Sequence, residues 1–218
     1  MLQANVLVVG LGGVGAYAAE MLVRSGVGRM TIADSDCVGE SNINRQLIAL
    51  HSTIGRPKSE VLAERLLDIN PALDLRVVND YIKDEKTDLL LDSERFDYVI
   101  DAIDSLKDKA HLILEASKSG AKLFASMGAA LKLDPTKVRV AEFWDVKGCP
   151  LGAALRKKFK KDKTYPKRKF KCVYSEELLE NKGEAPEVDG NSTWDVKKAQ
   201  INGSLVHITA IFGFTLSG

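Results

Sequence analysis

Short apolar runs alternate with longer amphipathic segments over the first 126 residues of the chain. Runs bounded by turn residues occur at residues 6–9, 30–33, 73–78, 96–104 and 121–126. Such runs are typical of strands buried on both faces of a sheet. Helical spacing of apolar residues between them predicts helices over residues 17–24, 59–69, 84–93 and 106–117. This alternation predicts an α/β fold, Rossmann-like and doubly wound around a mainly parallel sheet.

The alternation changes after Pro135. Residues 138–143 predict a strand, antiparallel at the sheet edge, and residues 150–159 predict a helix. Residues 180–194 are rich in Gly, Pro, Asn and acidic side chains, which predicts a mobile crossover loop. Residues 203–214 form a helix or a strand, in which we expect His207 to be packed or capped in the core. The sheet therefore gains antiparallel edge strands toward its C-terminal end.

Length and composition indicate a single globular domain. The chain has 218 residues and contains no run of about 18 apolar residues, the length that crosses a membrane. No secretory signal precedes the first strand, so we expect a cytoplasmic enzyme. Cys37, Cys149 and Cys172 are odd in number and form no C-x-x-C pair, which argues against a disulfide framework and a structural zinc site.

A net charge of +1 conceals one strongly basic segment. Residues 156–171 contain ten Lys or Arg and one Asp, a local charge of +9 that leaves −8 for the rest of the chain. Phe159, Tyr165 and Phe170 are interleaved with these cations. Cations with aromatics are suited to RNA phosphates and loop bases, but from the segment alone a solubilising linker is the preferred interpretation.

Glycines follow the first predicted strand in a G-x-G-x-x-G pattern. Gly10, Gly12 and Gly15 lead into a helix that begins near Val14. Glycine permits a tight turn and a close approach of backbone N–H groups to an anion, and the positive end of the helix dipole favours that charge. The pattern predicts a nucleotide site, but NAD, a flavin and a turn without ligand all fit it.

Polar residues beyond the second strand change this picture. Asp34 follows Gly15 by 19 residues, the separation at which an acidic residue binds a ribose hydroxyl in dinucleotide folds. Arg45 and Lys58 then place two cations on the side of the glycine loop. A triphosphate, with about four negative charges, requires such cations, whereas a nicotinamide cofactor does not. The alternative is that both are merely solvated at helix starts.

Two further carboxylates stand at the end of the fourth predicted strand. Asp101 and Asp104 are expected to point, with Asp34, into one crevice at the carboxyl edge of the sheet. Carboxylate and phosphate oxygens are ligands that Mg²⁺ prefers, which makes Asp104 a candidate partner for the metal. Alternatively, Asp104 and Ser105 cap the helix that follows.

Six motifs in this order resemble the ubiquitin-activating, ThiF/MoeB-like adenylating superfamily over about residues 5–145. They are G-x-G-G-x-G at 10–15, Asp34-x-Asp36, Asn42-x-x-Arg45-Gln46, Gly55-x-Pro57-Lys58, Asn70-Pro71 and Asp101-Ala-Ile-Asp104. The resemblance implies an ATP-binding adenylation domain over residues 1–145, with residues 146–218 as its C-terminal extension. The roles implied are contacts to the nucleotide by Gly10, Gly12, Gly13, Gly15 and Asp36, ribose binding by Asp34, charge neutralisation by Arg45 and Lys58, orientation by Asn42 and Gln46, and Mg²⁺ binding with ATP by Asp104.

Within the superfamily the sequence resembles the tRNA threonylcarbamoyladenosine dehydratase branch. The motifs of that branch are Asp101-Ala-Ile-Asp104-Ser105, Asp134-Pro135-Thr136, Cys172-Val173-Tyr174-Ser175-Glu176, Gly203-Ser204 and the segment 209–214. This resemblance implies adenylation of the carboxylate of threonylcarbamoyladenosine in tRNA, followed by cyclisation to a hydantoin. The alternative is an activator of a ubiquitin-like sulfur-carrier protein, although members of that branch commonly have two C-x-x-C pairs.

The resemblance also implies partners. These are tRNA bearing threonylcarbamoyladenosine, with Lys167, Arg168 and Lys169 as candidate tRNA contacts, and a second copy of the chain in a homodimer. Cys172 suggests a sulfur-relay protein that acts through a surface cysteine, or simply packing in a strand. Members of the superfamily usually carry a helical segment before the first strand, and we expect this sequence to be trimmed at its ends.

Overall fold

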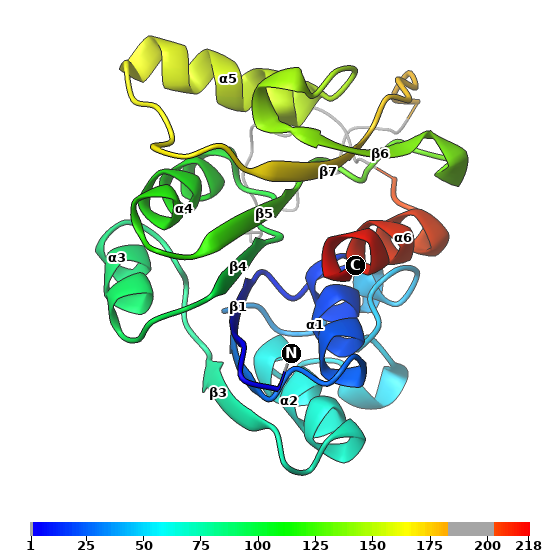
Figure 1. The fold of residues 1–218 in the computed structure, drawn as a ribbon. Coiled ribbons are helices and arrows are strands. Elements are labelled where there is room, and N and C mark those ends of the chain that lie inside the picture. The colour runs from blue at the N-terminus through cyan, green and yellow to red at the C-terminus, as the bar shows by residue number, and fades with distance from the viewer. Residues whose placement is uncertain (1, 183–202) are drawn as a thin grey trace, which may run out of the picture.

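The computed structural model describes residues 2–182 and 203–218, and its centre is one seven-stranded sheet (Figure 1). The order across the sheet is β3-β2-β1-β4-β5-β7-β6. The strands are β1 Asn5–Val9, β2 Arg29–Ala33, β3 Asp74–Val78, β4 Tyr98–Asp101, β5 Lys122–Ser126, β6 Val138–Glu142 and β7 Lys171–Ser175. Every pairing is parallel except that of β6 with β7. The predicted doubly wound, mainly parallel α/β fold with an antiparallel edge is therefore confirmed.

Helices cover both faces of the sheet. The helices are α1 Gly15–Arg24, α2 Lys58–Ile69, α3 Glu85–Asp92, α4 Leu106–Lys118, α5 Pro150–Asp162 and α6 Val206–Ser217. Short 3₁₀ turns occur at Glu40–Asn42, His51–Thr53, Pro135–Lys137 and Phe143–Asp145. Helices α1, α2 and α6 pack with one set of strand residues, and α3, α4 and α5 pack with the other set.

The side chains of β1 alternate between the two hydrophobic clusters on either face of the sheet. Leu7 and Val9 belong to the cluster beneath α3, α4 and α5, and Val6 and Val8 belong to the cluster beneath α1, α2 and α6. Successive side chains in a strand point to opposite faces, so an unbroken apolar run fits a strand that is covered on both sides.

Strand order reverses at β1, which lies between β2 and β4. The crevice at the carboxyl edge of such a reversal is the usual ligand site in doubly wound sheets. The turns that follow β1, β2 and β4 meet there, and they contain the glycine motif, Asp34 and Asp104 respectively.

Three sequence-based expectations change in detail. The fourth strand ends at Asp101, so Asp104 lies in the turn beyond it. The segment that was open to helix or strand is the helix α6, which packs closely on α1. His207 is exposed at the first turn of α6 and is not a core histidine. The predicted loop 180–194 lies almost entirely outside the described residues, and no helix among the described residues is long and apolar enough to span a bilayer.

Candidate nucleotide-binding site

The turn after β1 is built around glycines that the local packing requires. Gly10 has a φ of +88°, and a Cβ there would lie 2.8 Å from the carbonyl oxygen of Ala102. A Cβ at Gly15, the first residue of α1, would lie 1.8 Å from the carbonyl oxygen of Gly10. At Gly12 the nearest atom to a Cβ is Gln46 Nε2, at 3.6 Å. Gly10 and Gly15 therefore make the turn possible, whereas Gly12 leaves room for an anion at the N-terminal end of α1.

Asp34 joins the end of β2 to this turn. Its Oδ2 accepts a hydrogen bond from Leu11 N–H at 2.6 Å, and its Oδ1 accepts one from Asp36 N–H at 2.8 Å. Burial raises the pKa of Asp34, while the Leu11 hydrogen bond and the charge of Lys58 act in the opposite direction. A carboxylate oxygen has more than one acceptor site, so Asp34 can still accept a hydrogen bond from a ribose hydroxyl, as predicted.

Lys58 is a buried cation at the first residue of α2. Its Nζ lies 2.9 Å from Asp36 Oδ2, and its side chain is 7% exposed, compared with 65% for Asp36. Its backbone N–H donates to the carbonyl of Asp36 at 2.9 Å. Cys37 and Pro57 also form an isolated antiparallel β-bridge, which joins the turn after β2 to the start of α2. The alternative of a merely solvated surface lysine is therefore wrong for Lys58.

Arg45, Asn42 and Gln46 lie on the polar turn after β2. The Arg45 Nη1 group donates to the carbonyl of Ser41 at 2.8 Å and to Asn44 Oδ1 at 2.9 Å, which orients the guanidinium. Asn42 Oδ1 accepts from Gly39 N–H at 3.0 Å and closes the turn.

Gln46 differs from these two residues because it is 8% exposed and its Oε1 has no hydrogen-bond partner among the described residues. A buried polar atom without a partner is costly, and a bound ligand would satisfy it. The two ends of a carboxamide are distinguished only by their hydrogen-bond surroundings. In either orientation, the Gln46 side chain offers one donor group and one acceptor atom beside Gly12.

Thr209 was not predicted from the sequence, yet α6 brings it against the glycine turn. A Cβ at Gly13 would lie 3.2 Å from Thr209 Cβ and Cγ2. The Thr209 hydroxyl also donates to the carbonyl of Arg45 at 3.4 Å. Thr209 lies in the motif 209–214, but its neighbours in the sequence indicated no role at the site, because the contact joins segments 164 residues apart.

Asp104 is exposed in the turn between β4 and α4, and the described residues offer it no hydrogen bond or ion pair. Ser105, the N-cap residue of α4, makes no side-chain capping bond either, so the predicted capping role is not observed. The Asp104 carboxylate is therefore open to a ligand, as a metal partner must be.

Asp101 does not share the crevice with Asp104, contrary to expectation. Its side chain and that of Lys109 are both 0% exposed, and Lys109 Nζ lies 2.9 Å from Asp101 Oδ2. Burial raises the pKa of Asp101, against the effect of the Lys109 charge. The sequence contained a signal for Lys109, because it falls on the apolar face of α4 with Leu112, Ile113 and Ala116.

Tyr81, in the turn after β3, is a second residue that sequence reasoning missed. Its hydroxyl donates to Asp108 Oδ2 at 2.8 Å, and its side chain is 45% exposed. This hydrogen bond, with smaller contributions from Asp36 and Asp104, raises the pKa of Tyr81 to about 12. The hydrogen bond ties the turn after β3 to the first turn of α4.

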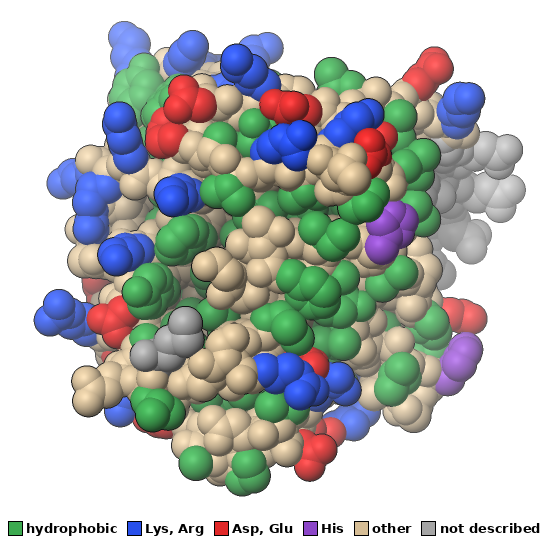
Figure 2. All heavy atoms as spheres, turned by 45° about the vertical axis from the view of Figure 1, so that its right-hand side comes forward, with side chains coloured by type: hydrophobic (Ala, Val, Ile, Leu, Met, Phe, Trp, Pro, Cys, Tyr) green, Lys and Arg blue, Asp and Glu red, His purple; other side chains and the backbone are tan. Residues whose placement is uncertain are grey.

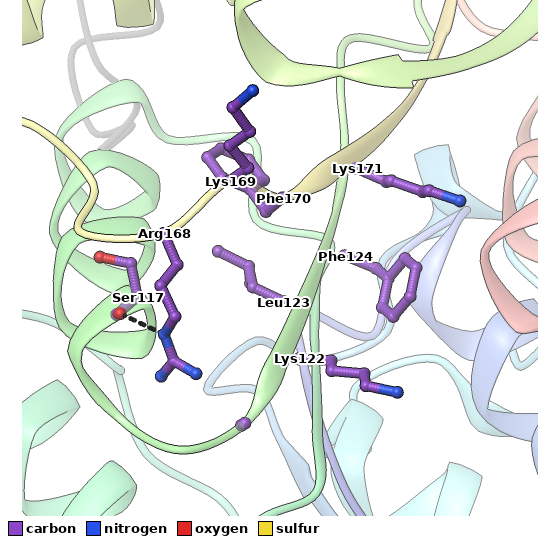
Figure 3. A pocket seen from close by; sticks show the side chains of 9 residues that line it. Ser117, Lys122, Leu123, Phe124, Arg168, Lys169, Phe170 and Lys171 are labelled. Atoms are coloured by element: carbon purple, nitrogen blue, oxygen red, sulfur yellow. Dashed lines mark hydrogen bonds between the residues drawn. The ribbon is translucent and has the colours of Figure 1, made fainter.

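The basic segment lies at the opposite edge of the sheet. β7 runs parallel to β5, so residues 167–169, which precede β7, stand at the amino edge. Arg168 Nε donates to the carbonyl of Ser117 at 3.0 Å and fastens the segment to the end of α4 (Figure 3). A shallow groove beside it is lined by Lys122, Phe124, Arg168, Lys169, Lys171 and neighbouring residues. The nucleotide-site residues and the candidate tRNA contacts are thus not brought together within one chain.

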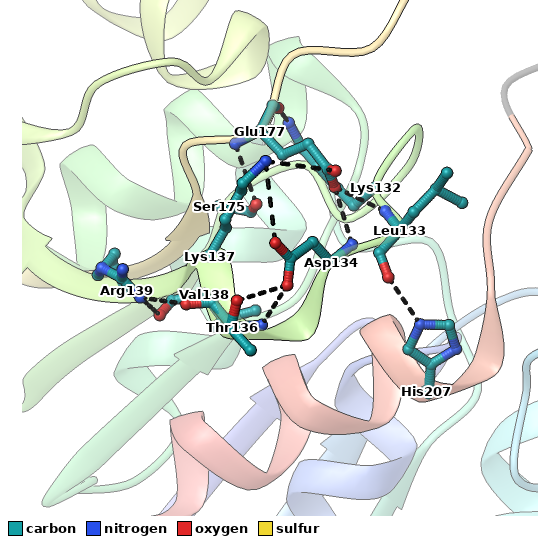
Figure 4. Close-up of polar contacts among 10 residues, drawn as sticks. All are labelled: Lys132, Leu133, Asp134, Thr136, Lys137, Val138, Arg139, Ser175, Glu177 and His207. Atoms are coloured by element: carbon teal, nitrogen blue, oxygen red, sulfur yellow. Dashed lines mark hydrogen bonds and ion pairs between the residues drawn. The ribbon is translucent and has the colours of Figure 1, made fainter.

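A polar cluster fixes the loop after β5 beside the site (Figure 4). Glu177 Oε2 accepts from the N–H groups of Leu133 at 2.6 Å and Asp134 at 3.1 Å, and the buried Lys132 Nζ donates to the Glu177 carbonyl. His207 Nε2 lies 3.0 Å from the carbonyl oxygen of Leu133 and ties the loop to α6. This contact accounts for His207 without a catalytic role.

Cys172 is fully buried in β7, and burial raises the pKa of its thiol. Packing in a strand is therefore the correct interpretation of Cys172. A surface cysteine for a sulfur-relay partner is not found at this position.

Comparisons with known proteins agree with this architecture. The model of the ThiF family matches residues 1–213. The tRNA threonylcarbamoyladenosine dehydratase of Haemophilus influenzae is 38% identical over 97% of this chain and 82% of its own, and the Bacillus subtilis protein of that name is 36% identical over 99% and 85%. The crystal structure of the E. coli tRNA N6-threonylcarbamoyladenosine dehydratase in complex with ATP matches with a TM-score of 0.83 and 35% identity, covering 99% of this chain and 83% of that one. The chain belongs to the ThiF family.

Proposed function

We propose that this protein is an ATP-dependent dehydratase that adenylates the carboxylate of threonylcarbamoyladenosine in tRNA and cyclises the product to a hydantoin. The observation that carries the proposal is the contact network from the glycine turn through Asp34 and Asp36 to the buried cation Lys58. The similarity to proteins of this name over 97% or more of the chain supports the choice of substrate.

The first step converts a poor leaving group into a good one. A carboxylate oxygen of the threonyl group attacks the α-phosphorus of ATP, which forms an acyl adenylate and releases pyrophosphate. Negative charge shifts onto the phosphoryl oxygens, and Lys58, Arg45 and the N-terminal end of α1 stabilise it electrostatically. Lys58 needs little reorganisation for this role, because Asp36 already holds its Nζ in place.

The metal implied by the family fits the residues at this site. Asp104 offers an exposed carboxylate, and Mg²⁺ is commonly held by one or two carboxylates together with substrate phosphates. When bound, the ion would neutralise phosphate charge and polarise the phosphoryl group. Asp34 binds the ribose, and Asn42 and Gln46 orient the nucleotide.

The second step needs no enzyme nucleophile. A ureido nitrogen of the same modification attacks the activated carbonyl carbon, forms the ring C–N bond, expels AMP and loses its proton. Because both groups belong to one molecule, positioning supplies most of the rate advantage. The proposed route therefore uses none of the three cysteines, of which Cys149 and Cys172 are buried and Cys37 is exposed.

Mass spectrometry of nucleosides digested from tRNA tests the proposal. Incubation of modified tRNA with the protein and Mg-ATP is expected to remove one water from threonylcarbamoyladenosine. The loss should require ATP and disappear in Asp104→Ala. An unchanged nucleoside, in a preparation that binds ATP, would contradict the proposed reaction. AMP transfer to a carrier protein ending in Gly-Gly would then favour the alternative, a sulfur-carrier activator.

We also propose that the basic segment 156–171 binds tRNA. Neutralising Lys167, Arg168 and Lys169 together, each to Gln, is expected to weaken tRNA binding without changing ATP affinity, because the trio lies at the amino edge of the sheet. The loss should shrink at higher salt, since phosphate contacts release counterions. A charge-matched control neutralises three exposed cations on β2, β3 and α3, away from the basic segment: Arg29, Arg76 and Lys86. Equal tRNA affinity of the two triple variants at two salt concentrations would refute a specific role.

A homodimer in the cytoplasm completes the proposal. Figure 2 shows apolar side chains gathered over the middle of the face that carries α6, with Lys and Arg side chains along its upper part. On α6 itself Val206 and Phe214 are each 45% exposed, and Val140 on β6 is 50% exposed. Apolar exposure of this kind favours a partner surface. Sedimentation equilibrium should give twice the chain mass of 23.8 kDa.

A further inference from the structure

A lysine and an aspartate without solvent contact lie directly beneath the turn that carries Asp104. Lys109 Nζ contacts Asp101 Oδ2 at 2.9 Å and the carbonyl oxygens of Ile103 at 3.0 Å and Asp101 at 3.5 Å. Asp101 Oδ1 in turn accepts a hydrogen bond from Ile103 N–H at 3.1 Å. Both backbone polar groups of Ile103 are therefore bound by the two members of one ion pair.

Stability alone does not account for this pair. Removing two charges from water is costly, and replacing a buried ion pair by apolar residues of similar volume is often neutral or stabilising. The surroundings of Lys109 are apolar, since Leu112, Ile113 and Ala116 on the same helix are fully buried. A charged pair at this position therefore calls for a role other than core packing.

The position of the pair connects it to the glycine turn. Ala102 N–H donates to the carbonyl of Val9 at 2.9 Å, and the carbonyl oxygen of Ala102 would lie only 2.8 Å from a Cβ at Gly10. Ile103 follows, held by Lys109 and Asp101, and the next residue is Asp104. Because adjacent Cα atoms are about 3.8 Å apart, fixing both polar groups of Ile103 restricts the path of the chain at Asp104.

We propose that the Lys109–Asp101 pair is a positioning device that holds the Asp104 carboxylate at the distance from the glycine turn that a metal-bound triphosphate requires. The inference rests on the proposed function, because Asp104 acts on Mg-ATP only there. Lys109 touches no substrate and acts through Ile103. Lys109 does not stabilise the phosphates electrostatically, because its side chain is fully buried and its charge is compensated by Asp101.

The first test needs no substitution. Amide hydrogen exchange of the wild-type protein without nucleotide should show the Ile103 amide exchanging as slowly as amides within β4, although Ile103 lies beyond the strand. Exchange as fast as that of an ordinary exposed turn would overturn the proposal, whatever the enzyme's substrate.

The second test uses the double variant Lys109→Met/Asp101→Asn, which removes both charges together and leaves neither buried alone. Calorimetric titration with ATP is performed at several Mg²⁺ concentrations and in EDTA. The Mg²⁺ concentration for half-maximal tight binding should rise about tenfold, the usual effect of losing a residue that orients a metal ligand, while binding in EDTA changes less than twofold. Unchanged Mg²⁺ dependence in the folded double variant would refute the positioning role.

A matched control removes another buried charge. Glu20 is 5% exposed and is paired with Arg24 and Arg65 between α1 and α2, away from the β4 turn. Glu20→Gln should lower the melting temperature and leave the Mg²⁺ dependence unchanged. If the wild-type protein binds Mg-ATP but leaves modified tRNA intact, the proposed function fails while the Mg²⁺ comparison still tests the pair. If tRNA is dehydrated and the double variant matches the wild type, the positioning role alone fails.

Discussion

Two alanine substitutions in the same glycine turn are expected to have opposite effects. A Cβ at Gly15 would lie 1.8 Å from the carbonyl oxygen of Gly10, so the backbone must move by about 1.2 Å to reach a tolerable 3.0 Å. A Cβ at Gly12 makes only an ordinary contact of 3.6 Å with Gln46, and the φ of Gly12 is not in the left-handed region. We therefore expect Gly15 to be required for folding and Gly12 to be required for binding ATP.

The magnitudes follow from these contacts. Overpacking between backbone atoms puts Gly15→Ala at about 3 kcal/mol of lost stability, or a fall in melting temperature of about 6 to 12 °C for a chain of this size. Gly12→Ala should leave stability unchanged or raise it by about 0.4 to 1 kcal/mol, because alanine restricts the unfolded chain. Losing one charge-assisted hydrogen bond to a phosphate costs about 1.5 to 3 kcal/mol, which lowers ATP affinity about 10- to 150-fold.

Thermal unfolding by circular dichroism and calorimetric titration with Mg-ATP measure the two effects separately. Gly120→Ala is the control, because a Cβ there meets no atom within 4 Å. It should bind ATP like the wild type and, like Gly12→Ala, be as stable as the wild type or about 0.4 to 1 kcal/mol more stable. A folded Gly12→Ala protein that binds ATP within twofold of wild type would refute the phosphate cradle. Wild-type stability of Gly15→Ala would refute the packing argument.

Two further predictions concern titratable side chains. Cys37 is exposed beside Asp36, whereas Cys149 and Cys172 are buried, so one thiol of three should react rapidly with a disulfide reagent and ATP should slow that reaction; rapid labelling of two thiols in the folded protein would contradict the structure. Tyr81, with its pKa raised to about 12 from an ordinary 10, favours the folded state below pH 10, and this contribution is lost as the pH rises from 10 to 12. Ultraviolet absorbance is titrated for the wild type and for Tyr81→Phe, and the difference between the two curves should show a tyrosine that ionises near pH 12. Asp108→Asn should return the pKa of Tyr81 toward 10.

Local pattern was sufficient for most of the sheet and for the turns that meet at the site. The unbroken apolar run in β1 predicts a strand that is buried on both faces, as observed. The glycine spacing that follows predicts the turn from this strand into a helix. Residues at the carboxyl ends of parallel strands share one edge, and the structure has Asp34 and Asp104 in the turns at that edge, while their roles toward a ligand stay predictions. Lys58 was a candidate for its charge, and only the structure showed that it is buried against Asp36.

The two aspartates after β4 show where local pattern fails. Asp101 is the last residue of the strand and points to the α4 face, where Lys109 neutralises it, while Asp104 lies three residues further on and points to solvent. The alternation of side chains along a strand predicts the face of the sheet on which a residue lies only as far as the last residue of that strand. The end of β4 depends on the contacts of Ala102 and Ile103 with the glycine turn after β1. These are tertiary contacts, so the local sequence does not reveal them.

The sequence alone determined the fold class, the position of the glycine turn and the charged residues near it, because these depend on periodicities and spacings of a few residues. The tertiary structure decided the direction in which β7 joins β5, and with it the edge of the sheet that carries the cations at 167–169. It also decided that Thr209, almost 200 residues after Gly13, completes the glycine turn. Strand direction and helix docking depend on long-range packing, which no short stretch of sequence encodes.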